Sequence, residues 1–354
     1  MPIPTEPVGS MPRSPELQAA MAANSAGDLT DAELEEFFDA AVSDTVERLA
    51  AVGSPVVADG EQAKSSFVTY PLEGLDTLAA DGVVIPFADG HQRQLPVLTA
   101  GPFRYQNVAG AYVERARRFT DLPIKQAVIS ASAMALLYPE SGIDDYDRDQ
   151  FIADLVDEAE ADIRSCFVAG ADSVQVDFTE ARLALKLDPS GGLLQQFIDL
   201  NNMVFGRFSA DERQRIGVHT CPGGDHDSTH SADVPYVDLI PAFLTLDCGR
   251  FFMQMASEVD PEPALAAVAA NPGQNQQVSV GVVDVCNEEV ESAETVWRRV
   301  LAAAEHLPND QLGTTDDCGF SPFADDVVTG RDTAFAKVAA RIEGTAMAAE
   351  QLGL

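Results

Sequence analysis

The chain of 354 residues is predicted to fold as a single (β/α)₈ barrel, the TIM barrel of the α/β class. Short runs rich in β-branched residues alternate with longer amphipathic segments rich in Ala, Leu and Glu, which is typical of a parallel α/β sheet or barrel. Eight strand–helix units fit in this length, the number that the barrel needs. With 46% hydrophobic residues the chain can bury one large core, so we expect one domain over residues 1–354.

Eight short apolar runs are the predicted strands, because β-branched and aromatic residues favour an extended backbone. In chain order they are Ser54–Ala58, Pro96–Thr99, Lys125–Ser130, Ser173–Asp177, Ile216–Thr220, Phe251–Met255, Val278–Val283 and Gly313–Asp317. The amphipathic segments are the predicted helices. These are Asp31–Ala51, Val108–Arg118, Arg148–Ala169, Gly191–Arg207, Val237–Thr245, Pro261–Ala269, Ser292–His306 and Arg331–Leu352. The least regular segment, residues 59–93, is predicted to carry extra loops or a hairpin over the barrel mouth.

The charge balance excludes several classes of partner. The formal charge is −35, from 57 acidic and 22 basic residues, so we expect no nucleic-acid partner and no anionic membrane partner. Polyanionic ligands would also be repelled. The residues Met1–Pro4 lack the charged head and apolar core of a signal peptide, and no apolar run reaches membrane-spanning length. Because the five cysteines also suit a reducing compartment, we expect a cytoplasmic protein.

The ends of two predicted strands indicate a metal site. His219 and Cys221 close one strand, and Cys318 follows another. Histidine and cysteine are ligands that zinc prefers, and barrel enzymes keep their chemistry at the carboxyl ends of the strands. We therefore predict one zinc with three protein ligands and a fourth position open to substrate. A thiol bound there is held as the nucleophilic thiolate, so the predicted chemistry is alkylation of sulfur.

Other polar residues also fall at predicted strand ends, namely Glu61, Asp177 and Asp284. The remaining histidines of this region, His226 and His230, lie in a Gly/Asp/Ser-rich stretch that indicates a mobile polar loop at the active site.

Several motifs resemble the catalytic barrel of cobalamin-independent methionine synthase, which shares its fold with uroporphyrinogen decarboxylase. Val8-Gly9-Ser10 followed by Pro12 is similar to the family's Ile-Gly-Ser-x-Pro element, whose backbone and serine hold the carboxylate of homocysteine. The resemblance implies the same role for Gly9 and Ser10.

Two acidic motifs extend the resemblance. Gly60-Glu61 is similar to the family's Gly-Glu, and Val174-Gln-Val-Asp177 is similar to its Ile-Gln-Ile-Asp. In the family both acids receive the substrate amine. An ammonium group needs acceptors and a carboxylate needs donors, so Ser10, Glu61 and Asp177 make a physically sensible clamp for an amino acid.

The zinc motifs match in part. His219-x-Cys221 and Asp317-Cys318-Gly319 are similar to the family's zinc ligands. The family's fourth ligand is a glutamate at the end of the sixth strand, where this chain has Gln254. The resemblance makes Glu258, four residues later, the candidate fourth ligand if the strand end is bulged or shifted, because zinc prefers an anionic ligand to an amide.

The proton-transfer and donor elements depart from the family. Its general-acid histidine aligns with Cys286, and Asp284 matches the aspartate of that element, so these two are the candidate catalytic residues. The aromatic residue that stacks on the folate aligns with Leu137, beside Tyr138. We expect no counterpart of the family's N-terminal half, which helps to hold polyglutamylated folate.

The resemblance implies a zinc-dependent methyltransferase that acts on a thiol, with homocysteine giving methionine as the first expectation. The methyl donor could be a methylated corrinoid protein, a simpler methyl compound or a monoglutamyl folate. Three alternatives stay open: zinc-dependent addition of a thiol to an epoxide, a decarboxylase of the uroporphyrinogen type, and a zinc- or thiol-binding protein without catalysis. The decarboxylase would need arginines at the barrel mouth to hold several substrate carboxylates.

Overall fold

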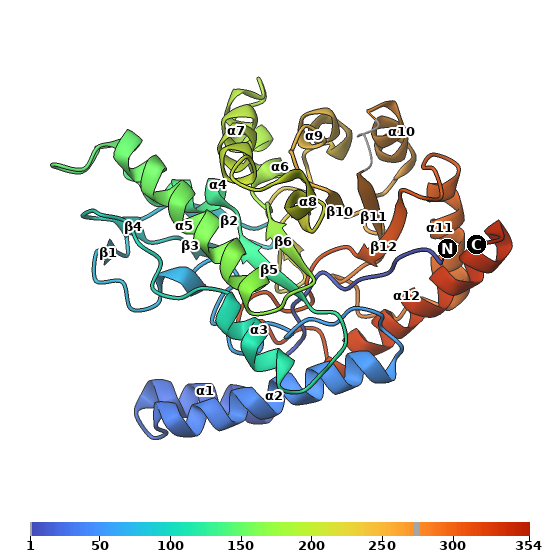
Figure 1. Ribbon diagram of the computed structural model, residues 1–354, viewed down its shortest axis with the longest axis horizontal. Coiled ribbons are helices and arrows are strands. Elements are labelled where there is room, and N and C mark those ends of the chain that lie inside the picture. Colours follow the sequence, from blue (N-terminus) through green and yellow to red (C-terminus); the bar gives the residue numbers. More distant parts are fainter. Residues whose placement is uncertain (1, 272–275) are drawn as a thin grey trace.

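The computed structural model describes residues 2–271 and 276–354. A parallel sheet of six strands, in the order β12–β11–β10–β7–β6–β5, forms most of the wall of an α/β barrel (Figure 1). Helices cover the outside of this wall, so the strands are buried nearly throughout, as is usual for parallel sheets. The strands are β5 (Lys125–Ile129), β6 (Ser173–Asp177), β7 (Ile216–Thr220), β10 (Arg250–Met253), β11 (Gln277–Val283) and β12 (Leu312–Asp316).

Two further segments continue the wall at its open edges through single parallel bridges. Thr5 pairs with Thr314 of β12, and Val57 pairs with Ile124 beside β5. The predicted α/β barrel is therefore confirmed. It brings the N-terminal segment, the loop after Val57 and the ends of the six strands to one mouth.

The prediction of a barrel strand at Pro96–Thr99 is wrong. Val97–Leu98 forms β4, which pairs antiparallel with β1 (Leu78–Ala79) outside the six-stranded sheet. Leu98 is buried in the core, which explains the apolar character of this run. The remaining wall segment is instead the one around Thr5, which pairs beside β12, and closely spaced prolines weaken its strand pattern in the sequence.

All eight predicted helices are confirmed, with bounds that differ by no more than two residues at either end. Capping boxes fix two of their starts, one built by Thr30 with Glu33 and one by Asp147 with Gln150. Among the described residues, no helix is long and apolar enough to span a membrane. The helices are α1 (Pro15–Ala26), α2 (Asp31–Ala51), α3 (Gly110–Arg117), α4 (Ala131–Met134), α5 (Arg148–Val168), α6 (Ala181–Leu187), α7 (Gly192–Phe205), α8 (Ala210–Arg213), α9 (Tyr236–Phe243), α10 (Glu262–Ala270), α11 (Ala293–Ala304) and α12 (Arg331–Leu352).

Two small hairpins, one in the loop after the segment at Val57 and one in the loop after β7, contact each other. The irregular segment that begins at residue 59 contains the 3₁₀ turn Tyr70–Leu72 and a hairpin of β2 (Val84–Pro86) and β3 (Gln92–Gln94). The loop after β7 forms a second hairpin from β8 (Gly224–Asp225) and β9 (Ser228–Thr229). The backbone N–H of Ala88 donates to the carbonyl of Thr229 at 3.0 Å, so the two hairpins are joined directly.

Candidate metal centre and active site

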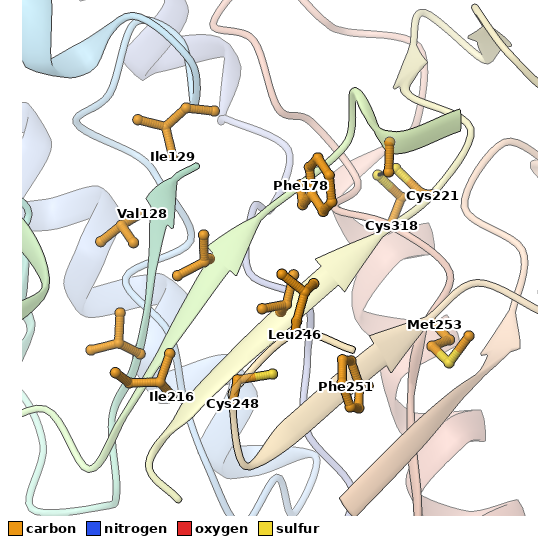
Figure 2. Packing of buried hydrophobic residues seen from close by; sticks show 14 of the residues in the cluster. Val128, Ile129, Phe178, Ile216, Cys221, Leu246, Cys248, Phe251, Met253 and Cys318 are labelled. Carbon is orange, nitrogen blue, oxygen red and sulfur yellow. Dashed lines mark hydrogen bonds between the residues drawn. The ribbon is translucent and has the colours of Figure 1, made fainter. Parts of the chain in front are cut away.

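Three metal-ligating side chains meet where β7 and β12 end. The ligand atoms of His219, Cys221 and Cys318 all lie within 4.8 Å of one another. Figure 2 shows the sulfur atoms of Cys221 and Cys318 side by side beyond the strand ends, and they are 3.3 Å apart. The structure therefore brings together three of the four residues that the sequence indicated as ligands.

The histidine of this cluster is oriented as a metal ligand would be. Its Nδ1 lies 3.2 Å from the carbonyl oxygen of Phe252, which fixes Nδ1 as the protonated nitrogen. The side chain is only 1% exposed, yet its Nε2 has no hydrogen-bond partner among the described residues. A buried nitrogen lone pair without a partner is costly, and a cation between Nε2 and the two sulfurs would satisfy it.

The two thiols can ionise together only if a positive charge lies between them. The hydrogen bond with Cys221 raises the pKa of the Cys318 thiol, and burial adds to this effect. Two thiolates at this spacing cannot both be ionised in a buried site unless a cation compensates them. One imidazole and two thiolates are a donor set that zinc prefers, so these residues fit the metal.

The fourth predicted ligand, Glu258, lies outside this group. Its Oε1 accepts a bond of 2.7 Å from Arg182 Nη1 and one of 2.8 Å from Gln254 Nε2. Arg182 also donates to Gln254 Oε1 at 3.0 Å, so the three side chains form a closed network. The strand end is not shifted enough to bring Glu258 to the His219–Cys221–Cys318 cluster, and the buried arginine binds its carboxylate instead.

A cavity beside the metal cluster is lined by Val8, Gly9, Ser10, Glu61 and Asp177 together with His219 and Cys318. Ser10 comes from the N-terminal segment, and its Oγ accepts a hydrogen bond of 3.2 Å from the backbone N–H of Ser321. Gly319 lies so close to Ser10 that a Cβ at position 319 would be 2.1 Å from the serine Oγ. The glycine after Cys318 is therefore required for the approach of Ser10 to the cluster.

Glu61 has a strained backbone and a buried carboxylate in this cavity. Its φ is 55°, in the left-handed region that only few non-glycine residues adopt. The residue is 3% exposed, and Lys64 Nζ donates to its Oε1 at 3.0 Å. Burial raises the pKa of Glu61 to about 7, although the charge of Lys64 acts in the opposite direction. Backbone strain of this kind clusters at active sites and ligand-binding sites, where the surrounding structure fixes the side chain.

Asp177 is the second buried carboxylate of the cavity. It ends β6, and its Oδ1 accepts a bond of 2.8 Å from Gln175 Nε2. Burial raises the pKa of Asp177, and the negative charge of Asp177 raises the pKa of Glu61 in turn. Two buried carboxylates with raised pKa values gain from a cationic partner, so this end of the cavity suits an ammonium group.

Arg13 and Lys64 organise this cavity, and the sequence did not indicate them. Arg13 Nη2 donates to the carbonyls of Glu61 and Lys64 at 2.7 and 2.6 Å. Its Nη1 donates to the carbonyl of Phe323 at 3.1 Å, so one buried guanidinium joins the loop that carries Glu61 to the loop after Cys318. Lys64 also donates to the carbonyl of Ala127 at 2.9 Å. The i,i+3 spacing of Glu61 and Lys64 was the only local signal.

Asp317, immediately before Cys318, holds the loop that follows β10. Its Oδ1 accepts from the backbone N–H groups of Met255 and Ala256 at 2.9 and 2.8 Å, and its Oδ2 accepts from that of Ser257 at 2.7 Å. These bonds fix the chain between Gln254 and Glu258 and also the backbone from which Cys318 projects. Asp317 therefore has a positioning role beside the metal cluster.

Replacing Asp317 with asparagine is expected to lower the free energy of unfolding by about 1–3 kcal/mol, because an amide presents N–H groups to backbone donors and leaves them unsatisfied. Chemical denaturation of the metal-free protein measures this loss without a contribution from the metal. The Asp316→Asn variant is not a suitable control, since Asp316 pairs with buried Arg341. Asp310→Asn, at an exposed turn, is the matched control, and equal stability of the Asp317→Asn and Asp310→Asn variants would contradict the positioning role.

The two candidate catalytic residues lie in the loop after β11. Asp284 Oδ1 accepts from the backbone N–H of Cys286 at 3.0 Å. Cys286 shares a cavity with Cys318, Asp284 and Asp317. Its pKa is raised by burial and by the neighbouring Cys318. The structure thus places Cys286 in a cavity that Cys318 also lines, while Asp284 orients the backbone of Cys286.

A second cavity, of about 390 Å³, adjoins the first and shares Phe67, Thr179, Gly223 and Gly224 with it. Aromatic and aliphatic side chains form much of its wall, among them Phe87 and Phe323. The two histidines of the predicted polar loop lie in different places. His230 lines this cavity, and His226 lies at the turn of the β8–β9 hairpin. Burial lowers the pKa of His230 to about 4, so this imidazole is neutral.

Comparison with known proteins gives a consistent result. Residues 3–339 match the family model described as cobalamin-independent synthase, catalytic domain. The methionine synthase of Saccharolobus solfataricus is 24% identical over 353 residues, covering 99% of this chain and 96% of that protein. The 5-methyltetrahydropteroyltriglutamate–homocysteine methyltransferase of a Synechococcus strain is 24% identical over 322 residues, and the chain spans only 40% of its length.

Two solved structures have the same fold. A B12-independent methionine synthase from Shewanella sp. W3-18-1, in complex with selenomethionine, superposes with a TM-score of 0.76 at 18% identity and covers 99% of both chains. A putative vitamin-B12-independent methionine synthase from Listeria monocytogenes superposes with a TM-score of 0.73 at 20% identity, covering 97% of both chains.

Proposed function

The chain belongs to the family of cobalamin-independent synthase catalytic domains, and on this premise we propose that it is a zinc-dependent methyltransferase that methylates homocysteine to methionine. One observation carries the proposal: the His219–Cys221–Cys318 cluster and the buried acids Glu61 and Asp177 line one cavity. A thiol and an ammonium group of one small molecule can therefore be bound together. We also propose a cytoplasmic location, which suits free thiols.

Each part of the amino-acid thiol has a partner of suitable chemistry in this cavity. Glu61 and Asp177 accept hydrogen bonds from the ammonium group, and Ser10 with the backbone around Gly9 donates to the carboxylate. Zinc on His219, Cys221 and Cys318 would hold the substrate sulfur as a thiolate, which is the form that attacks carbon. The clamp then orients that sulfur toward the methyl donor. This positioning lowers the barrier to methyl transfer without any acid–base chemistry.

The donor side supports a small or neutral methyl donor. Of the described residues that line the second cavity, only Arg93 carries a formal positive charge. Its guanidinium is bound by both oxygens of Asp225, at 2.5 and 3.1 Å, and by both oxygens of Asp325, at 2.9 Å each. An arginine that already binds two carboxylates cannot receive a polyanionic tail as well, and the net charge of −35 repels one.

We therefore expect polyglutamylated methylfolate to be a poor donor. A methylcobalamin-type or small methyl donor should give faster homocysteine methylation at matched concentrations. Such a donor does not need the stacking aromatic residue that Leu137 replaces, and it does not need unpaired cations in the cavity. The assay measures methionine formed with each donor. Turnover with polyglutamyl folate equal to that of a full-length methionine synthase measured alongside would contradict this expectation.

The decarboxylase alternative is disfavoured by how the arginines near the cavities are bound. Arg93, which lines the second cavity, already pairs with Asp225 and Asp325. Arg13 donates to backbone carbonyls, and Arg182 is bound to Glu258 and Gln254, so neither is available for several substrate carboxylates. Addition of a thiol to an epoxide would use the same metal site without needing Glu61 and Asp177. Homocysteine methylation in the donor assay, with no product from epoxides, separates the two transferase reactions.

A further inference from the structure

We propose that Cys286 is a third thiolate donor to the metal centre, and that it occupies the coordination position which the substrate sulfur takes on binding. The inference rests on the proposed function, since it assumes the metal on His219, Cys221 and Cys318. It goes further because it assigns to Cys286 a role in the resting site in place of a role in proton transfer.

The first observation is the position of the Cys286 thiol. A Cβ placed on Gly224 would lie 3.7 Å from Cys286 Sγ and 4.0 Å from Cys318 Sγ, so the two sulfurs flank this glycine. Both cysteines also line the same cavity of about 180 Å³. Because Gly224 has no side chain, the space beside it on the side of both sulfurs stays open for the Cys286 side chain to approach the cluster.

The second observation is that the backbone of Cys286 is fixed while its thiol is free. The backbone N–H donates to Asp284 Oδ1 at 3.0 Å. Among the described residues, the thiol itself has no hydrogen-bond partner and is only partly exposed. A change of χ1 rotamer moves a cysteine sulfur by about 3 Å without any movement of the backbone.

The third observation is that the centre lacks a fourth donor and that the nearby carboxylates are committed elsewhere. Glu258 is bound by Arg182 and Gln254. Asp317 uses both oxygens for three backbone N–H groups. The buried Nε2 of His219 has no hydrogen-bond partner among the described residues, which supports a cation at this cluster and so the need for further donors around it. Zinc is four-coordinate in most protein sites and favours thiolates, and Cys286 is the remaining soft donor beside the cluster.

Substrate binding is then an exchange of one sulfur for another. With the metal bound, the substrate thiol would lose its proton as its sulfur takes the position held by Cys286, and Cys286 would leave as a thiol that carries this proton. The number of sulfur ligands stays at three, and no net charge is gained or lost. Cys286 thereby shields the buried site from other ligands until the amino-acid clamp brings in the correct thiol.

Cobalt substitution tests this exchange, because sulfur-to-cobalt charge-transfer absorption in the near ultraviolet increases with the number of thiolate ligands. In the Cys286→Ser variant loaded with Co²⁺ the band should fall by about one third, from three thiolates to two. Saturating homocysteine should leave the wild-type band unchanged and restore the band of the variant. Cys248→Ser is the matched control, since its hydroxyl can still donate to the Arg250 carbonyl as the thiol does at 3.3 Å.

A second variant keeps the thiol and blocks its path. Gly224→Ala places a methyl group between Cys286 and Cys318 at ordinary contact distances, so the fold is retained while the approach is obstructed. Its cobalt band should fall as in Cys286→Ser. Bands equal to wild type in both variants, or a wild-type band that rises by half with homocysteine, overturn the proposal. Failure of the wild type to take up cobalt or zinc at all would instead overturn the proposed function.

Discussion

Replacing Cys318 with serine is expected to remove most of the bound zinc and to abolish methyl transfer. A serine hydroxyl stays protonated at neutral pH, so the substitution removes one of the two thiolates of the His219–Cys221–Cys318 cluster. The remaining Cys221 and His219 would be left in a buried pocket with a much weaker metal affinity. Because Lewis-acid stabilisation of the thiolate contributes several kcal/mol, we expect activity to fall about 10³-fold or more.

The matched control for this substitution is Cys166→Ser, which removes another buried cysteine from helix α5, away from the metal cluster. Zinc content by elemental analysis and methionine formation are measured on both variants after the same expression and purification. Full zinc content in the Cys318→Ser protein would show that this cysteine is not a ligand.

Removing either carboxylate of the clamp is expected to abolish the preference for an amino-acid thiol. Hydrogen bonds to a charged group contribute about 1.5–3 kcal/mol, so Glu61→Gln or Asp177→Asn should weaken homocysteine binding by roughly ten- to a hundredfold. In the wild type, homocysteine should raise the melting temperature by mass action while mercaptoethanol, which lacks the amino-acid group, should not. In either variant this difference should be lost.

The pH dependence gives a second measure of the clamp. Burial raises the pKa of Glu61 to about 7, so the carboxylate becomes protonated as the pH falls through this value and then no longer attracts the ammonium group. As the pH falls below about 7, homocysteine affinity should decrease more steeply in the wild type than in Glu61→Gln, because only the wild type has this carboxylate. The dependence on the thiol proton is the same in both proteins. Equal stabilisation by the two thiols at all pH values would instead favour the epoxide-type transferase.

Much of the fold was predictable because local and global signals agree. The six strands of the parallel sheet are short, nearly continuous apolar runs because both of their faces are buried, and the eight predicted helices are the longer segments between and beside them. The wall segment at Thr5 was not predictable. It pairs through a single bridge, and its neighbouring prolines interrupt the strand pattern. The run at Val97–Leu98 has the apolar pattern of a strand but pairs outside the six-stranded sheet.

The site was predictable where its residues end strands of the wall, since the barrel brings such ends together. His219, Cys221, Cys318 and Asp177 are of this kind. Residues whose partners lie far away in the chain could not be found in this way. Arg13 contacts Phe323 across 310 positions. Glu258 is bound by Arg182, which lies 76 positions away in a helix that the sequence did not indicate.

The most direct test of the central claim is the zinc content of the isolated wild-type protein, measured by elemental analysis after expression in zinc-replete medium. The arrangement of His219, Cys221 and Cys318, with a buried imidazole nitrogen that has no partner, predicts about one zinc per chain. A protein that contains no zinc under these conditions would contradict the proposal that this family member activates a thiol through a metal.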